Sequence, residues 1–184
     1  MRIESPPDSG YPGIVLRQLE RTDIPAWFDY LSIPEVIEHT SWNLGSAADL
    51  VPMLDAYESG APTSMRRMAI VDEEHGALVG TIGFHTISDV NRSAEIAYDL
   101  APAYWGRGIA SAVCAAVTAW AFTHEGRLRV QGVVLETNLR SDTVLRKCGF
   151  SYEGLLRAYR MVRGTPGNFR MYARLDEDAG GPVN

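Results

Sequence analysis

The segment from Ser93 to Leu135 constrains the fold of this chain more than any other segment. Residues 93–101 (SAEIAYDLA) alternate apolar and polar side chains, which is typical of a strand. A long apolar helical pattern runs from about residue 107 to 124, and a nearly continuous apolar run at 128–137 (LRVQGVVLET) is typical of a central strand. A strand, a helix and a second strand in this order predict a right-handed parallel crossover.

Further strands and helices are predicted on both sides of this crossover. A strand at 13–20, helical segments up to residue 60 and two strands at 65–72 and 77–88 precede it, and a short helix at 141–149 follows it. Two long strands joined around RGTPGN (163–168) end the pattern. This order predicts an α/β or α+β domain with a mixed sheet over residues 13–175, flanked by a disordered N-terminal arm (1–12) and a disordered tail (176–184).

Composition and charge exclude several classes of protein. The chain has 184 residues and a formal net charge of −6, which argues against nucleic-acid partners. It contains no apolar run of about 18 residues and no apolar signal-peptide core, so we expect a cytoplasmic protein with no membrane partner. Cys114 and Cys148 both lie in apolar patterns, which favours reduced, buried thiols over a disulfide framework or a metal site.

Two glycines flank a cation where the long helix begins, in PAYWGRG (102–108). Glycine allows a ligand to approach the backbone closely, and the unpaired N–H groups of a first helical turn attract anions. The segment is therefore open to three interpretations: a tight turn, a dinucleotide-binding loop, or a pyrophosphate site for coenzyme A. The dinucleotide pattern is incomplete, because APAYW separates the loop from its strand and Ser111 stands where a third glycine is expected.

Three longer stretches together resemble the GCN5-related N-acetyltransferases (GNAT family), and within them the branch that acetylates ribosomal-protein N-termini (RimJ/RimL-like). They are LRQLERTDIPAWFDYLSIPEV (16–36), GTIGFHTISDVNRSAEIAYDLAPAYWGRGIASAV (80–113) and ETNLRSDTVLRKCGFSYEGLLRAYRMVRG (136–164). The resemblance implies the GNAT acyl-CoA N-acyltransferase fold, whose mixed, mostly antiparallel sheet is splayed at the coenzyme site. It also implies acetyl-CoA as co-substrate, without a metal, and a homodimer as one assembly.

The resemblance also implies a set of residues that bind the coenzyme. Strand backbone would hold the pantetheine arm, and the glycine loop would wrap the pyrophosphate, with Trp105 in place of the usual Gln or Arg. Arg107 is either a cation beside the phosphates or a solvated side chain; Asn138 either binds the pantetheine amide or only shapes a turn. Ser141 either caps the helix that follows or reaches the coenzyme sulfur. The implied set is Ile96, Ala97, Tyr98, Trp105, Gly106, Arg107, Gly108, Ile109, Ala110, Ser111, Asn138 and Ser141.

The implied reaction moves acetyl from acetyl-CoA to a primary amine by direct attack through a tetrahedral intermediate. The acceptor is a protein N-terminus or a small amine such as a polyamine or an aminoglycoside. The amine must lose a proton, and the oxyanion needs a donor, for which a backbone N–H near Ala97 or Tyr98 is suited. Many members of the family carry a tyrosine acid where this chain has Leu145, and some ribosomal-protein members carry a glutamate base where it has Arg160. These two differences motivate one alternative, a coenzyme-binding module without turnover. The glycine loop leaves a nucleotide-binding oxidoreductase as another.

Ser141, Glu95 and Glu136 are the catalytic candidates that remain. Glu95 is otherwise an exposed strand residue, and Glu136 a solvated carboxylate at a strand end. His39 and His85 are further options for proton transfer. The acceptor pocket is expected between EVIEHTSW (35–42) and the C-terminal hairpin, lined by Trp42 and Tyr159, with Tyr172 as a further candidate.

Overall fold

A computed structural model describes residues 3, 5–41, 43–59, 61 and 64–180. Its centre is one seven-stranded sheet with the strand order β1-β2-β3-β4-β5-β7-β6. The strands are β1 (Ile14–Gln18), β2 (Arg66–Asp72), β3 (Ala77–Ser88), β4 (Ser93–Leu100), β5 (Arg129–Leu135), β6 (Ser151–Val162) and β7 (Thr165–Leu175). The α-helices are α1 (Ile24–Leu31), α2 (Pro34–Ile37), α3 (Val51–Glu58), α4 (Ile109–Thr123) and α5 (Leu139–Lys147).

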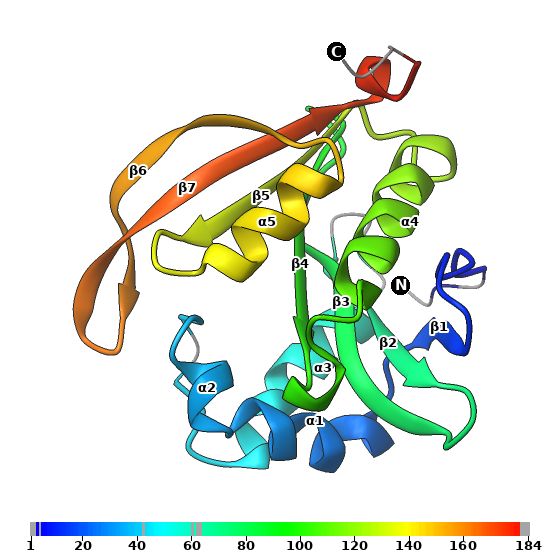
Figure 1. The fold of residues 1–184 in the computed structure, drawn as a ribbon, viewed down its shortest axis with the longest axis vertical. Coiled ribbons are helices and arrows are strands. Elements are labelled where there is room, and N and C mark those ends of the chain that lie inside the picture. Colours follow the sequence, from blue (N-terminus) through cyan, green and yellow to red (C-terminus); the bar gives the residue numbers. More distant parts are fainter. Residues whose placement is uncertain (1–2, 4, 42, 60, 62–63, 181–184) are drawn as a thin grey trace.

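The sheet is mixed, as the sequence predicts. Neighbouring strands from β1 to β4 are antiparallel, β4 and β5 are parallel, and β5, β7 and β6 are again antiparallel. The parallel pair is joined by α4, which confirms the predicted strand–helix–strand connection. Figure 1 shows β6 and β7 arching away from β4, on the far side of β5.

The C-terminal hairpin turns more tightly than the predicted RGTPGN loop. Only Arg163 and Gly164 form the turn, both with positive φ (47° and 82°), and Thr165 already pairs with Val162. Pro166 lies opposite Met161 of β6, but the pairing between β5 and β7 ends at Phe169, so β7 is an edge at Pro166 on the side of β5, where a proline is tolerated.

Helices cover both faces of the sheet, and the alternation of β2 shows how. Met68 and Ile70 belong to the core beneath α4, whereas Ala69 and Val71 belong to the core formed with α1, α2 and α3. All four side chains are buried, since successive residues of a strand point to opposite faces. Figure 1 shows α4 and α5 in front of the sheet and α1–α3 gathered at its lower end.

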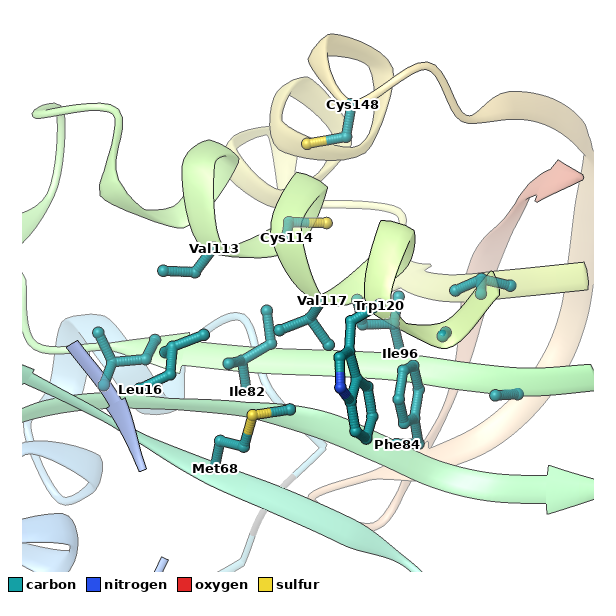
Figure 2. Close-up of a cluster of buried hydrophobic side chains, with 14 of the residues drawn as sticks. Leu16, Met68, Ile82, Phe84, Ile96, Val113, Cys114, Val117, Trp120 and Cys148 are labelled. Carbon is teal, nitrogen blue, oxygen red and sulfur yellow. The ribbon is translucent and has the colours of Figure 1, made fainter. Parts of the chain in front are cut away.

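Trp120 of α4 is a central contact between helix and sheet. Its ring lies parallel to that of Phe84, at 6.4 Å between centroids, and Figure 2 shows both within the apolar layer that Ile82, Ile96 and Val117 complete. Across the described residues, no helix has the length and apolar character that a membrane crossing requires.

The N-terminal arm differs from the expected disordered segment in the residues that the structure describes. Ile3 is buried and its N–H donates to the Gln18 side chain (2.9 Å). The Trp120 indole donates to the Ser5 carbonyl (3.1 Å), and buried Ser9 donates to the Ile14 carbonyl. These contacts involve residues up to 115 positions away, so local composition does not reveal them. In the expected disordered tail, residues 176–180 form a short 3-10 helix, and 181–184 lie outside the described residues.

Replacement of Trp120 tests both contacts of its ring. Trp120→Ala leaves a large cavity against Phe84 and should lower the free energy of unfolding by about 3–5 kcal/mol. Trp120→Phe keeps most of the apolar contact but loses the hydrogen bond to Ser5, and should cost only about 1–2 kcal/mol. Urea unfolding measures the free energy of unfolding of both variants. Equal decreases in the two would show that the contact of the aromatic ring with Phe84 contributes little to stability.

Candidate functional site

β4 and β5 pair over a short distance and then separate. Their register covers Ser93 with Arg129, Ala94 with Val130 and Glu95 with Gln131, whereas β4 continues to Leu100 and β5 to Leu135. The outer halves of the two strands therefore diverge and leave a gap in the middle of the sheet. This confirms the splayed sheet that the resemblance to the GNAT family implies.

Hydrogen bonding to β3 decides which backbone groups of β4 face this gap. The Ala101 N–H donates to the Val79 carbonyl (2.8 Å), and in an antiparallel ladder the hydrogen-bonded pairs recur at every second residue. Asp99 and Ala97 therefore direct their N–H and C=O groups toward β3. The corresponding groups of Ile96 and Tyr98 point the other way, toward the gap.

β5 presents its backbone to the gap in the same way. The Glu136 N–H donates to the Asn168 carbonyl (3.0 Å), which places the hydrogen-bonded β5–β7 pairs at even-numbered β5 residues. Val133 and Leu135 therefore direct their backbone groups toward β4. The gap thus offers an unpaired strand edge on each side, to which an extended amide-containing ligand can hydrogen-bond.

A groove of about 530 Å³ runs from the gap to the start of α4. Gly106 and Gly108 line it, with φ of 74° and 88°, a left-handed conformation that favours glycine. No atom lies within 4 Å of the place where a Cβ of Gly108 would sit, so conformation and not crowding requires this glycine. Ile109, Ala110 and Ser111 also line the groove, and the first-turn N–H groups of α4 make it suited to an anion.

The cations at this groove differ from those that the sequence suggests. The Arg107 guanidinium lies 5.0 Å from the Tyr104 ring centroid, and Arg107 does not line the groove. Arg140 and Lys147 of α5 line it instead. The Arg140 guanidinium lies 4.2 Å from the ring centroid of Trp105, whose indole donates to the Leu100 carbonyl (2.6 Å).

Asn138 is the N-cap of α5. Its Oδ1 accepts a hydrogen bond from the Ser141 N–H (3.0 Å), and its Nδ2 donates to the His39 carbonyl (3.3 Å). The prediction that Ser141 caps this helix is wrong, because α5 begins at Leu139 and Ser141 lies within the first turn. The Ser141 carbonyl accepts from the Tyr98 hydroxyl (3.2 Å), which ties α5 to the open edge of β4.

A second, smaller cavity of about 110 Å³ lies on the other side of the gap. Five residues line both cavities and mark the passage between them: His39, Thr40, Tyr98, Asn138 and Ser141. Leu145 also lines the smaller cavity, and it is buried against Gly132 of β5. An aliphatic side chain thus fills the position where the resemblance leads us to expect a tyrosine.

Glu95 lines the smaller cavity and is buried, not exposed on its strand. Its Oε1 accepts a hydrogen bond from Nη2 of Arg160 (2.8 Å). A register shift in β3 between Phe84 and Thr86 brings His85 to the same cavity. Burial, with the charges of Arg67 and Arg160 nearby, lowers the pKa of His85 to about 3, so the imidazole is neutral at pH 7.

A loop after α2 closes the smaller cavity and is held from two elements. The Arg163 guanidinium at the tip of the β6–β7 hairpin donates to the carbonyls of Ile37, Glu38 and Thr40, each at 3.0 Å. Asn138 holds the same loop through the His39 carbonyl. His39 lines both cavities, and its buried Nδ1 has no hydrogen-bond partner among the described residues.

Besides Arg107, three expected site residues lie outside both cavities. The Glu136 Oε1 accepts from the Asn168 amide (3.1 Å) at the base of the hairpin. Tyr159 is exposed and contacts Phe169 edge-on, and Tyr172 is buried with its hydroxyl donating to Asp142. Trp42 lies outside the described residues. Phe169 and Arg160 form the hairpin side of the smaller cavity instead.

Comparison with known proteins identifies the family of this arrangement. Residues 14–151 match the family described as acetyltransferase (GNAT) domain. The chain is 33% identical over 162 residues to an uncharacterized N-acetyltransferase, YoaA, of Bacillus subtilis (strain 168), a match covering 87% of this chain and 92% of the relative.

Solved structures share the fold at lower sequence identity. A ribosomal-protein-S5-alanine acetyltransferase from Vibrio fischeri superposes with a TM-score of 0.79 at 16% identity, covering 91% of this chain and 96% of that one. A spermidine N-acetyltransferase from Vibrio cholerae, in complex with CoA and spermine, gives 0.80 at 21% identity, covering 91% and 98%.

The lowered pKa of His85 predicts a dependence of stability on pH. The unfolded chain binds a proton here below about pH 6.5, whereas the folded chain does so only near pH 3. The stabilising contribution is therefore complete above pH 6.5 and is lost as the pH falls, by about 2 kcal/mol at pH 5. His85→Gln should lose that much less unfolding free energy than the wild type between pH 8 and pH 5 in urea titrations. Equal losses in the two proteins would contradict the assignment.

Proposed function

This chain belongs to the GNAT acetyltransferase family and is an N-acetyltransferase, and from this premise we propose that it transfers acetyl from acetyl-CoA to a primary amine where β4 and β5 separate. Two kinds of similar protein suggest two acceptor classes. A ribosomal-protein acetyltransferase suggests protein N-termini, and a spermidine acetyltransferase suggests small amines such as polyamines. The observation that supports the proposal is the passage between the two cavities, which connects an anion-binding groove to a buried carboxylate.

The larger groove has the donors that coenzyme A requires. The first-turn N–H groups of α4 and the two positive-φ glycines suit the pyrophosphate, and Arg140 and Lys147 add positive charge. The pantetheine arm is an extended chain with amides, and the open edge of β4 at Ile96 and Tyr98 offers hydrogen bonds to it. Ala97 is less suited than the sequence suggests, because its backbone groups pair with β3. The dinucleotide-binding alternative is excluded by the family.

The residues around the passage can perform the chemical steps. Acetyl-CoA supplies an electrophilic thioester carbonyl. A backbone N–H of Tyr98 or Ile96 can stabilise the oxyanion that forms when the amine attacks. Glu95 Oε1 accepts a hydrogen bond from Arg160, whereas its Oε2 has no hydrogen-bond partner among the described residues. Oε2 can therefore accept the proton of the amine directly or through water.

The departing thiolate needs a hydrogen-bond donor that Leu145 cannot supply. The Ser141 side chain is the candidate, since Ser141 lines both cavities and its helix is capped by another residue. The Tyr98 hydroxyl already donates to the Ser141 carbonyl, and burial raises the pKa of Tyr98 well above its ordinary value. Tyr98 therefore positions the first turn of α5 as a neutral phenol.

Gly108→Val tests the coenzyme groove. The valine side chain would extend toward the pyrophosphate site and should abolish the stabilisation by coenzyme A, which for the wild type is about 2.7 kcal/mol, or about 5–10 °C in Tm, at a hundredfold excess over Kd. A branched residue at positive φ also costs about 1–2 kcal/mol by itself.

Gly76→Val is the matched control. Gly76 has a φ of 63° in the β2–β3 turn, outside both cavities, and no atom lies within 4 Å of the place where its Cβ would sit. It should suffer similar strain but keep the full shift with coenzyme A. An undiminished shift in Gly108→Val would place the coenzyme elsewhere.

Glu95→Gln tests the proposed base. Thiol release from acetyl-CoA, measured with peptides, amino acids, polyamines and aminoglycosides, should fall about 10²- to 10⁴-fold in kcat/KM, with unchanged stabilisation by acetyl-CoA. Glu153→Gln is the control, because Glu153 also pairs with an arginine, Arg129, but lies outside both cavities. Wild-type rates in Glu95→Gln would remove Glu95 as the base. A wild-type protein that binds acetyl-CoA but releases no thiol with any amine would favour the module without turnover.

A further inference from the structure

Two residues with opposite formal charges face each other in the smaller cavity. Of its lining residues, only Glu95 and Arg160 carry a formal charge at pH 7 besides histidines, and they share one hydrogen bond. A guanidinium has several N–H donors, and Glu95 accepts only one of them at Nη2. The cavity thus presents a carboxylate oxygen and guanidinium N–H groups side by side.

The Arg160 guanidinium is held in a fixed place by aromatic rings. It lies 4.9 Å from the ring centroid of Tyr159 and 5.6 Å from that of Phe169. Both distances are within the range of a cation–π interaction. The hydrogen bond to Glu95 and the two ring contacts together position Arg160 before any ligand binds.

A bulge in β6 turns Arg160 toward the cavity. The register between β6 and β7 shifts between Leu156 and Arg160, and Ala158 within the shift has a φ of 49°. Its N–H donates to Oδ1 of Asn168 (2.9 Å), whose amide in turn donates to Glu136. An unusual backbone that is held by side-chain hydrogen bonds indicates that the direction of Arg160 is built into the strand.

From this geometry we propose that Arg160 selects acceptor amines that carry a carboxylate close to the amino group. The proposal rests on the proposed function above and names its substrate class. The amino group would lie at Glu95 and the carboxylate at Arg160, so that a zwitterion matches the pair of charges in the cavity. A polyamine would instead bring a second cation next to Arg160 and meet a single carboxylate that is already paired. His85 adds no competing cation, because it is neutral at pH 7.

The test compares each acceptor with its own uncharged analogue. Thiol release from acetyl-CoA is measured with α-, β- and γ-amino acids, each beside its primary amide, and with spermidine. For at least one amino acid, kcat/KM in the wild type should exceed that of its amide and of spermidine about tenfold or more. In Arg160→Gln the ratio of acid to amide should fall to near one; in Arg160→Lys part of it should remain.

Arg157→Gln is the matched control. Arg157 lies three residues earlier in β6, is exposed and lines neither cavity, so the ratio should stay at the wild-type value. The ratio of kcat/KM for the acid to kcat/KM for its amide is taken within each variant, so any general effect of the substitution on Glu95 cancels. Stabilisation by acetyl-CoA verifies that each variant is folded. If Arg160→Gln does not fold, the wild-type and Arg160→Lys ratios decide.

Several outcomes would overturn the proposal. One is equal or better turnover of amides or spermidine by the wild type; another is an acid-to-amide ratio unchanged in Arg160→Gln. A preference for succinyl-CoA over acetyl-CoA that disappears in Arg160→Gln would also overturn it, because Arg160 would then serve the acyl chain. If the wild type acetylates amines without any preference for a carboxylate, this inference fails while the proposed function stands. If no amine is acetylated, the proposed function itself fails.

Discussion

The separation of β4 from β5 is the feature on which the rest of the site depends. Each strand remains paired on its other side, β4 with β3 and β5 with β7, beyond the point where the two diverge. Tyr98 and Leu145 pack into the core between the gap and α5, and they keep the strands apart. The open backbone edges, the groove toward α4 and the smaller cavity all result from this one interruption of the ladder.

β4 is also anchored from beneath, on the face opposite to α4. Asp99 accepts hydrogen bonds from Thr81 (2.9 and 2.8 Å), from Tyr30 of α1 and from the buried guanidinium of Arg67. Arg67 in turn donates to Thr81 through Nε (2.8 Å). A buried cation needs such a partner, and here the pair joins β2, β3 and β4 to α1. This network explains how β4 keeps its position without β5.

The smaller cavity is enclosed by parts of the chain that are distant in sequence. Arg163 holds the loop after α2 from the hairpin tip, 123 or more residues away, and Asn138 holds it from α5. Capping carbonyls at the end of a helix with a guanidinium satisfies groups that have no partner within the helix. Three elements therefore meet at the smaller cavity, and its shape depends on the tight turn at Arg163 and Gly164.

The sequence by itself determined the features that depend on near neighbours. Alternation in 93–101 predicted β4, and Gly106 and Gly108 marked the turn before α4. The short helix predicted at 141–149 is α5, although it begins at Leu139 and its N-cap is Asn138. Only the tertiary structure decides which charged side chains meet at the site. Glu95 meets Arg160 across 65 residues, and Arg140, not Arg107, faces the groove, because strand order and helix packing bring these side chains together. Strand order likewise places Glu136 beside Asn168, which donates a hydrogen bond to it. The sequence does not predict such contacts, because an ion pair or hydrogen bond between distant residues leaves no periodicity in the sequence.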